Sequence, residues 1–328
     1  MSEMTSNRPR IFDRQIEGRF AWRRSDVSPR DWLIPIPRQA LDEVDGVVEI
    51  LKANPMDVRA LSSDDYPLAA CRDLMREVKQ ILDEGVGLAV LDRLSVERHG
   101  KESLISIYWL LASMIARPVA QSFDGKLLYD VRDTGLKTST RVRGDLTNQE
   151  LSWHSDYGFN FPPPYLGLLV LRAAKEGGVS SAASLMTAHN VLRERNPDLL
   201  QRLYEPFFWN RQGEHPEGDP VVHFHPMFEY DGKAVRGRYN QSLIPKGYEL
   251  AGETFDARGQ EAIKALAAIM AEQENHFSFV LEPGQLQFVN NFKLAHLRTD
   301  YVDHDEPDAK RHLVRIFLRD YGRRSYMG

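Results

Sequence analysis

The sequence predicts a mostly β fold, an antiparallel sandwich or jelly roll with helices packed around it. From about residue 144 onward, short apolar runs separated by turn signals follow one another, among them LSWHSDYGF, PYLGLLVLRAA, QLQFVNN and HLVRIFLRD. Few of these runs alternate with helices in the βαβ rhythm of a parallel sheet. A jelly roll also brings strands that are distant in the sequence together at one open end.

Helices are expected mainly before this region. Leu74, Val78, Ile81 and Leu82 form a stripe at helical spacing, with Gly85 placed to end the helix. The run VGLAVL then predicts a buried strand. Further helices are expected at about residues 102–116, 188–194, 197–204 and 260–275.

The strand region contains one strong turn signal and a well-defined end. Asp231-Gly232 predicts a hairpin between the runs DPVVHFHPMFEY and AVRGRYNQSLI. Asn196-Pro197 is a typical helix start, with a capping side chain followed by a first-turn proline. The chain is expected to finish with three strands, HFSFVL, QLQFVNN and HLVRIFLRD.

Residues 1–45 are expected to form an irregular leader that lies over the core. Arg and Pro are frequent there, and Trp22, Trp32 and the segment LIPIPR suit an extended chain. Residues 46–328 are predicted to form a single domain, because no convincing boundary follows residue 80 and no internal repeat is visible.

Composition excludes several classes of function. The net charge of -5 and the lack of a basic run argue against a nucleic-acid binder. The single cysteine, Cys71, excludes an internal disulfide and a cysteine-based metal site. No apolar run is long enough to cross a membrane. We therefore expect a cytoplasmic enzyme with a small-molecule substrate, and a homo-oligomer remains possible.

The run LSWHSDYGF carries the most informative residues, His154 and Asp156. In an extended strand, residues two apart point to the same side, so both could bind one metal ion. Two imidazoles and one carboxylate form the facial triad of non-haem iron(II) oxygenases, which leaves three positions open. The second imidazole must come from another strand, and His296 in VNNFKLAHLRTDY is the candidate.

A His-x-acid pattern by itself is not specific. His215-Pro216-Glu217 and His304-Asp305-Glu306 also fit it, but they lie in polar stretches that predict solvated loops. His154 differs because apolar residues frame it on both sides, and a half-buried carboxylate needs a cation or hydrogen-bond donors. Polar residues on strands are often satisfied without a metal, so the tripeptide alone does not decide.

The last predicted strand carries arginines on one face. In RHLVRIFLRD the odd positions Arg311, Leu313, Arg315, Phe317 and Arg319 share a side. A guanidinium in a partly dry pocket suits a carboxylate, which it binds through two parallel hydrogen bonds. The alternative is that this face lies in solvent, as most arginines do.

The chain resembles the iron(II)- and 2-oxoglutarate-dependent dioxygenases of the taurine and 2,4-dichlorophenoxyacetate dioxygenase family. The matching stretches are LSWHSDYGF, LLVLRAAKEGGVSSAASLMTAHNVL, EPGQLQFVNNFKLAHLRTDY and KRHLVRIFLRD, in that order, within about residues 81–320. The resemblance implies a double-stranded β-helix in which His154, Asp156 and His296 hold Fe(II). It also implies that 2-oxoglutarate and O2 bind at this iron.

The resemblance further implies that an arginine holds the far carboxylate of 2-oxoglutarate. Arg311 and Arg315 both fit the family's Arg-x-x-x-Arg pattern, and we expect Arg311, with Arg315 helping or facing an anionic group of the substrate. An acidic insert, DHDEPDAK, precedes them, so the choice stays open. Ser180, with Ser181 as a near alternative, matches the hydroxyl residue that meets the same carboxylate.

The implied reaction is oxidation, most often hydroxylation, of an unactivated C–H bond in a small polar or charged metabolite, with release of succinate and CO2. Asp156 favours hydroxylation or desaturation, because related halogenases lack this carboxylate. Candidate substrate-binding residues lie beside the triad or on an upstream loop: Tyr157, Phe159, Asn160 and Arg141. Asn290 and Asn291 could orient His296 or its loop, or could be ordinary turn residues.

Two other functions remain open at this stage. His223-Phe224-His225 places two imidazoles on one side of a strand, as in cupin-type metalloproteins, although no carboxylate follows at a suitable spacing. A non-enzymatic jelly-roll binding module would need neither iron nor His296. Neither alternative explains why His154, Asp156, His296 and the arginine strand occur together.

Overall fold

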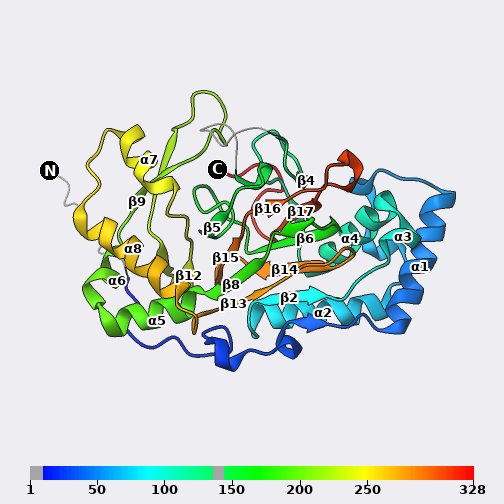
Figure 1. The fold of residues 1–328 in the computed structure, drawn as a ribbon, viewed down its shortest axis with the longest axis horizontal. Helices are drawn as coiled ribbons and strands as arrows, with labels where there is room; N and C mark the ends of the chain where they lie inside the picture. The colour runs from blue at the N-terminus through cyan, green and yellow to red at the C-terminus, as the bar shows by residue number, and fades with distance from the viewer. Residues whose placement is uncertain (1–9, 136–143) are drawn as a thin grey trace.

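The computed structural model describes residues 10–135 and 144–328. Two β-sheets enclose a cavity lined by residues of both, and helices cover the outside (Figure 1). This arrangement confirms the predicted mostly β jelly roll, the double-stranded β-helix, with flanking helices. No helix in the described ranges combines the length and the apolar character needed to cross a membrane.

The larger sheet has seven strands within the described residues, and all its pairings except β1 with β2 are antiparallel. Their order is β1 (Leu33–Ile34), β2 (Leu88–Leu91), β14 (Leu286–Asn290), β6 (Tyr165–Arg172), β17 (His312–Leu318) and β3 (Pro118–Val119), with β4 (Leu128–Val131) also paired to β17.

The smaller sheet positions the candidate site. Its order is β13 (His276–Phe279), β8 (Ser180–Ser184), β15 (Leu294–Arg298) and β5 (Leu151–His154). Three antiparallel pairs complete the described strands: β9 (Phe207–Asn210) with β10 (Val222–His225), β11 (Phe228–Tyr230) with β12 (Val235–Gly237), and β16 (Tyr301–Val302) with β7 (Glu176–Gly177).

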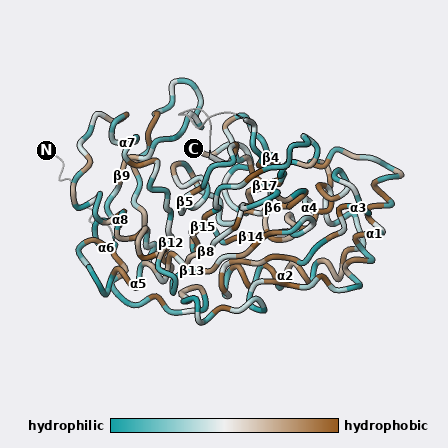
Figure 2. The backbone as a smooth tube through the Cα atoms, in the orientation of Figure 1, coloured by the Kyte–Doolittle hydropathy of each residue, from teal (hydrophilic) through white to brown (hydrophobic). Residues whose placement is uncertain are grey.

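Helices lie on the outer face of the larger sheet and beyond the opposite end of the smaller one (Figure 1). The first group is α1 (Arg38–Ala53), α2 (Ala69–Asp83), α3 (Val96–His99) and α4 (Lys101–Ile115). The second group is α5 (Leu185–Arg195), α6 (Pro197–Leu203), α7 (Leu243–Ala251) and α8 (Ala257–Ala271). Figure 2 shows apolar segments running along α2 and β14, with mostly hydrophilic loops at the periphery.

Strand β17 separates two apolar clusters, because its side chains alternate between the faces of the sheet. Val314, Ile316 and Leu318 pack outward with apolar residues of α1, α2 and α4. Leu313 and Phe317 pack inward with the apolar residues between the sheets. Every residue of β17 is buried, as expected for a strand covered on both faces.

Most of the predicted elements are present. Helices α2, α4, α5, α6 and α8 correspond to the predicted ranges, and Asn196 caps α6 by accepting a hydrogen bond from the Leu199 amide at 3.2 Å. The hairpin at Asp231-Gly232 joins β11 to β12, and Gly232 takes the positive φ of 95° that favours glycine. Helix α7 was not predicted, and strand β15, which carries His296, was expected only as a strand without a defined range.

Part of the expected leader packs against the core, and the segment is not irregular throughout. Trp22 is buried, and its indole nitrogen donates to the Val86 carbonyl at 2.9 Å. Trp32 stacks on Phe277 with ring centroids 5.6 Å apart. Helix α1 begins at Arg38, so the last part of residues 1–45 is helical, contrary to expectation. The division into leader and single domain stays a prediction.

Helix α2 has no capping side chain of its own, and helix α1 supplies one. Glu43 accepts hydrogen bonds from the Ala70 and Cys71 amides, each at 2.9 Å. These amides are among the first-turn donors that lack a partner within the helix, and the carboxylate also faces the positive end of the helix dipole.

We expect Glu43→Ala to lower the free energy of unfolding by about 1–2 kcal/mol, because two partly buried amide donors lose their acceptor. Denaturant unfolding followed by circular dichroism measures this change. Glu49→Ala, which removes only an exposed ion pair with Lys52, is the control and should cost about 0.5 kcal/mol or less. Equal losses in both variants would show that Glu43 is not a cap.

Candidate active site

The two histidines of the predicted triad form a cross-strand pair. Strands β5 and β15 are antiparallel neighbours, and His296 lies directly opposite His154. Directly opposite residues project from the same face of a sheet, so the two rings meet, with centroids 4.3 Å apart. The two histidines are 142 residues apart in the sequence, and the pairing of β5 with β15 brings them together.

Asp156 completes the cluster, but it does so from a turn. Strand β5 ends at His154, and Asp156 lies in the turn that follows, so the expected extended His-x-Asp geometry is wrong in detail. Its Oδ1 lies 3.5 Å from Nε2 of each histidine. One ligand atom from each residue lies within 4.8 Å of the others, so the three side chains could hold one metal ion.

The turn is shaped by a residue in an uncommon conformation. Tyr157 has a φ of 59°, in the left-handed region that non-glycine residues seldom adopt and that costs about 1 kcal/mol or more. Its ring is buried against Phe159 and Phe317, with centroids 5.0 and 5.7 Å away. This packing stabilises the turn that carries Asp156 into the site.

Asn291 holds the backbone of Asp156 from the opposite side. Its Oδ1 accepts a hydrogen bond from the Asp156 amide at 2.8 Å, and its Nδ2 donates to the Asp156 carbonyl at 2.8 Å. Nδ2 also donates to the Pro163 carbonyl at 3.0 Å. Asn291 therefore holds the turn that carries Asp156, whereas the sequence predicted a role toward His296 or its loop.

Asn290 is a turn residue, which was the alternative role considered for Asn290 and Asn291. It donates to the Leu82 carbonyl at 3.0 Å and accepts from the Phe292 amide at 3.2 Å. These bonds anchor α2 and shape a turn at the end of β14, away from the three triad side chains.

The hydrogen bonding of His154 and the lowered pKa of His296 both favour metal binding through Nε2. Nδ1 of His154 lies 2.8 Å from the Ser152 carbonyl, which can only accept, so this nitrogen carries the proton and Nε2 keeps its lone pair. Burial lowers the pKa of His296, and the neighbouring His154 lowers it further, so His296 is neutral near pH 7. Neutral imidazole is the form that binds a metal ion.

Arg315 compensates the buried charge of Asp156. Burial would raise the pKa of Asp156, but Arg315 and the two imidazoles outweigh it and hold this pKa well below its usual range. Nη1 of Arg315 donates to Oδ2 of Asp156 at 3.1 Å, and its Nε donates to Gln121 at 2.9 Å. The carboxylate is therefore ionised, with Oδ2 held by Arg315 and Oδ1 directed toward the histidines.

A cavity extends from the triad between the two sheets. Its walls are largely apolar: Leu88, Val131, Leu151, Leu166, Leu168, Phe279, Leu281, Val289, Leu294, Leu297 and Leu313. Arg311 also lines it, and Nη1 of Arg311 is buried with no hydrogen-bond partner among the described residues. A buried guanidinium nitrogen that lacks an acceptor indicates a place for an anionic ligand.

The arginine face of β17 is therefore not in solvent, and that alternative is wrong. Arg311, Arg315 and Arg319 are 7%, 4% and 2% exposed. Ser180 and Ser181 both line the cavity, and the hydroxyl of Ser181 is 2.7 Å from that of Ser278. Ser180 is thus placed where a hydroxyl could meet a ligand bound to Arg311.

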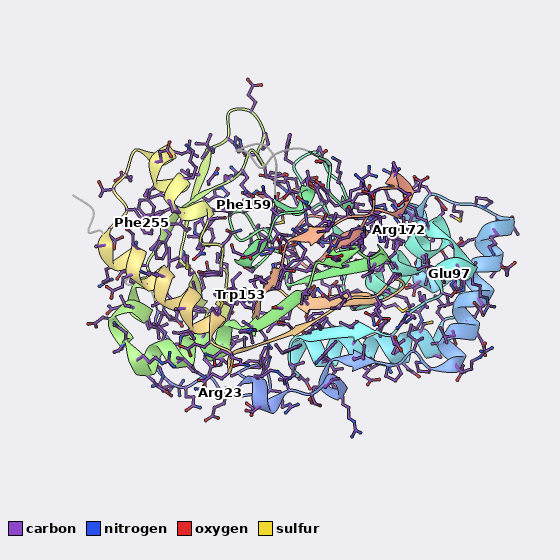
Figure 3. The ribbon with its side chains drawn as sticks, viewed as in Figure 1. Arg23, Glu97, Trp153, Phe159, Arg172 and Phe255 are labelled. Atoms are coloured by element: carbon purple, nitrogen blue, oxygen red, sulfur yellow. The ribbon has the colours of Figure 1, made fainter. Side chains whose placement is uncertain are left out.

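The predicted substrate residues are distributed differently from expectation. Tyr157 and Phe159 are buried in the apolar core, and neither lines the cavity beside the triad, which differs from the expectation that they bind the substrate beside it. Figure 3 shows Phe159 beyond the end of β5, away from Trp153 on that strand. Asn160 lines a second cavity. Arg141 lies outside the described residues.

Sequence reasoning missed three polar residues of the site. Gln121 accepts a hydrogen bond from Nε of Arg315. Gln287 lines the cavity, and its buried Oε1 has no hydrogen-bond partner among the described residues. Arg298 also lines the cavity and donates to the Thr147 carbonyl at 3.3 Å. Arg298 and Gln287 lie within the quoted stretch EPGQLQFVNNFKLAHLRTDY, so alternation along its strands could have identified them. Gln121 has no local signal, because only the fold brings it to Arg315.

We expect Asn291→Ala to weaken iron(II) binding about 10–100-fold, because the backbone of Asp156 loses two hydrogen bonds that position it. Anaerobic titration with iron(II), followed by calorimetry, measures the dissociation constant. Asn290→Ala is a matched control: it removes a neighbouring buried amide of the same type and should lower stability without changing iron affinity. Unchanged iron affinity in Asn291→Ala would contradict this role.

Comparisons with known proteins agree with this geometry. A family model described as "Taurine catabolism dioxygenase TauD, TfdA family" matches residues 57–317. FR-33289 synthase of Streptomyces rubellomurinus is 28% identical over 314 residues, covering 94% of this chain and 91% of that protein. Taurine hydroxylase-like protein SAT17 of Stachybotrys chartarum is 25% identical over 302 residues, covering 88% of this chain and 76% of that protein.

Solved structures share the fold. Asparagine oxygenase in complex with Fe(II), 2S,3S-3-hydroxyasparagine and succinate has a TM-score of 0.67 at 20% identity, over 88% of this chain and 93% of that one. The non-heme iron oxygenase OrfP in complex with Fe and alpha-ketoglutaric acid has a TM-score of 0.63 at 16% identity, over 88% and 94%. The family match, spanning most of the sequence, shows that the chain belongs to the TauD/TfdA dioxygenase family and is an Fe(II)- and 2-oxoglutarate-dependent dioxygenase.

Proposed function

We propose that this enzyme hydroxylates an unactivated C–H bond of a small polar or charged metabolite, with release of succinate and CO2. The observation that carries the proposal is the continuity of one cavity from the three candidate metal ligands to Arg311, whose buried Nη1 has no hydrogen-bond partner among the described residues. That arrangement provides a metal site at one end and an anion site at the other, which suits a dicarboxylate cosubstrate.

His154, Asp156 and His296 are assigned as the ligands of Fe(II). Two neutral imidazoles and an ionised carboxylate are the donor set of the facial triad. Arg315 keeps Asp156 ionised, and Asn291 holds its backbone, so both act as positioning residues. Iron(II), 2-oxoglutarate and O2 supply the oxidising chemistry, and the protein supplies orientation and a dry surrounding.

Arg311 is assigned to the far carboxylate of 2-oxoglutarate, with Ser180 beside it. Arg315 is less suited to this role, because it is already engaged by Asp156 and Gln121. The leucine-rich walls exclude water around the bound dicarboxylate and strengthen its ion pair with Arg311. Hydroxylation is proposed over halogenation because Asp156 occupies the position of the carboxylate ligand.

The substrate class is inferred from the relatives. Their names refer to small molecules, as in uridine-5'-phosphate dioxygenase and gamma-butyrobetaine dioxygenase. The structure of asparagine oxygenase contains 2S,3S-3-hydroxyasparagine, which is also a small molecule. A small polar or charged metabolite is common to all of these. A cytoplasmic location and a homo-oligomer remain predictions.

The two alternatives from the sequence have less support. Among the described residues, the triad is the one cluster of three histidine, cysteine, aspartate or glutamate side chains that could hold a metal ion, so His223 and His225 lack the further ligands of a cupin-type site. A binding module without enzymatic activity is disfavoured by membership of a dioxygenase family.

The first test is an anaerobic titration of the metal-free protein with iron(II) and then 2-oxoglutarate. We expect a weak visible charge-transfer band that needs both additions and that disappears in His154→Ala, because the triad loses one of three ligands. His276→Ala, which changes a histidine on β13 outside the cavity lining, should keep the band. A band that persists in His154→Ala would remove this residue from the metal site.

A second test separates cosubstrate binding from metal binding. We expect Arg311→Leu to raise the dissociation constant of 2-oxoglutarate at least about tenfold while iron affinity stays unchanged, because a charge-assisted carboxylate contact is lost. The charge-transfer band, titrated with 2-oxoglutarate at saturating iron, measures this.

The control is Arg319→Lys, at a buried arginine of the same strand face that does not line the cavity. It should leave 2-oxoglutarate affinity unchanged. If Arg311→Leu binds 2-oxoglutarate as tightly as the parent protein, another residue holds the far carboxylate.

A further inference from the structure

A second cavity, of about 370 Å³, adjoins the loop that carries Asp156. Its polar lining comes from β10, β11, β12 and the segments after β5 and β12: His223, His225, Glu229, Arg236, Arg238 and Asn160. Aromatic and proline side chains, among them Phe161 and Phe292, form the remaining wall. No residue lines both this cavity and the one that contains Arg311.

The second cavity is tied directly to the backbone of the triad loop. Nη1 of Arg238 donates to the Gly158 carbonyl at 3.2 Å, two residues after Asp156. The next residue, Tyr239, exchanges hydrogen bonds with Ser155, and Asn240 forms a β-bridge with His154. The loop that carries Asp156 is therefore shared by both cavities.

The cavity has more donors and positive charge than negative charge. Two guanidinium groups and two imidazoles line it, and Glu229, which Arg238 holds at 2.9 Å, is the one carboxylate side chain among its lining residues. Tyr321 and Gly328 of the C-terminal segment also line it. The side chain of Arg238 is 12% exposed and that of Glu229 is 42% exposed, so the cation is the more deeply buried partner. Arg236 pairs at 3.1 Å with Asp231, which does not line the cavity.

The two imidazoles provide further evidence of a positive local potential. Burial, followed by the charge of Arg238, lowers the pKa of His225 to about 4. Burial and then Arg211 lower the pKa of His223. Nδ1 of His223 lies 3.0 Å from the Phe159 carbonyl, so the proton is on Nδ1 and the ring is held in one orientation. The rings lie with centroids 5.2 Å apart.

We propose that this cavity binds an oxyanion group of the substrate, a carboxylate, phosphate or phosphonate, with Arg238 as its main contact and His223 and His225 as additional donors. The inference rests on the proposed function, because it places the substrate beside the triad loop. Arg238 and the histidines then anchor the charged end of the substrate, and the rest of the molecule extends toward the metal ligands.

A cationic ligand fits this cavity less well. Glu229 is the one carboxylate side chain among the residues that line it, and it is already engaged by Arg238. An ammonium group would also meet Arg236 and Arg238, and unlike an oxyanion it could not accept hydrogen bonds from them. An entering oxyanion instead favours protonation of the histidines, which supplies further N–H donors.

The test uses the full chain, both metal-free and loaded anaerobically with iron(II) and 2-oxoglutarate. Calorimetric titrations with phosphate, methylphosphonate and acetate distinguish the kinds of oxyanion, and methylammonium is the cationic probe. In the loaded protein Arg311 is occupied by 2-oxoglutarate, so an added anion must use another site.

We expect at least one oxyanion to bind once per chain, and Arg238→Gln to weaken it about tenfold to a hundredfold. His225→Gln, which leaves the loop contacts of Arg238 in place, should weaken binding by a smaller factor. Arg195→Gln removes an arginine from an exposed ion pair with Glu272 and should leave binding unchanged. Thermal unfolding confirms that each variant is folded.

Three outcomes would overturn the proposal: no binding of any oxyanion, equal affinities in the parent chain, Arg238→Gln and His225→Gln, or binding of methylammonium in preference. The charge-transfer band keeps this result separate from the proposed function. Loss of anion binding with an intact band overturns only the cavity assignment. If the band is absent in the parent chain, the proposed iron and 2-oxoglutarate site fails, while the metal-free titration still tests the cavity.

Discussion

The arrangement of the site depends on one buried anion, the carboxylate of Asp156. An ionised carboxylate cannot remain in a largely apolar interior without opposite charge or donors. Arg315 contacts it from the larger sheet, and His154 and His296 face it from the smaller one. The same carboxylate therefore links both sheets at this end of the jelly roll and directs one oxygen toward the two imidazoles.

The surrounding structure supports this carboxylate through its backbone as well as its charge. The turn at Tyr157 adopts an uncommon conformation, and aromatic packing on one side and Asn291 on the other hold it there. Local strain of this kind persists only where neighbouring contacts over-determine it. Gln121 extends the same support to Arg315, so the ion pair is held by contacts made at both of its members.

The two cavities beside the triad loop have different polar linings. The cavity between the sheets is apolar apart from the triad, Arg311 and a few polar side chains, and it suits a dicarboxylate held at both ends. The second cavity, which contains Arg238, is basic and lies against the same triad loop. In the proposed function, cosubstrate and substrate approach this loop from different sides, so each can bind without displacing the other.

The sequence by itself determined the class of fold, most helices and strands, and the identity of the three candidate ligands. Hydrophobic alternation and turn residues act over short distances, and His154, Asp156 and His296 lie in family motifs. Tertiary structure decided what depends on contacts between distant segments: the pairing of β5 with β15, the buried face of β17, and the partners of Arg315 and Asn291. It also placed Tyr157 and Phe159 in the core, because they lie in the turn after His154 and not on an extended strand.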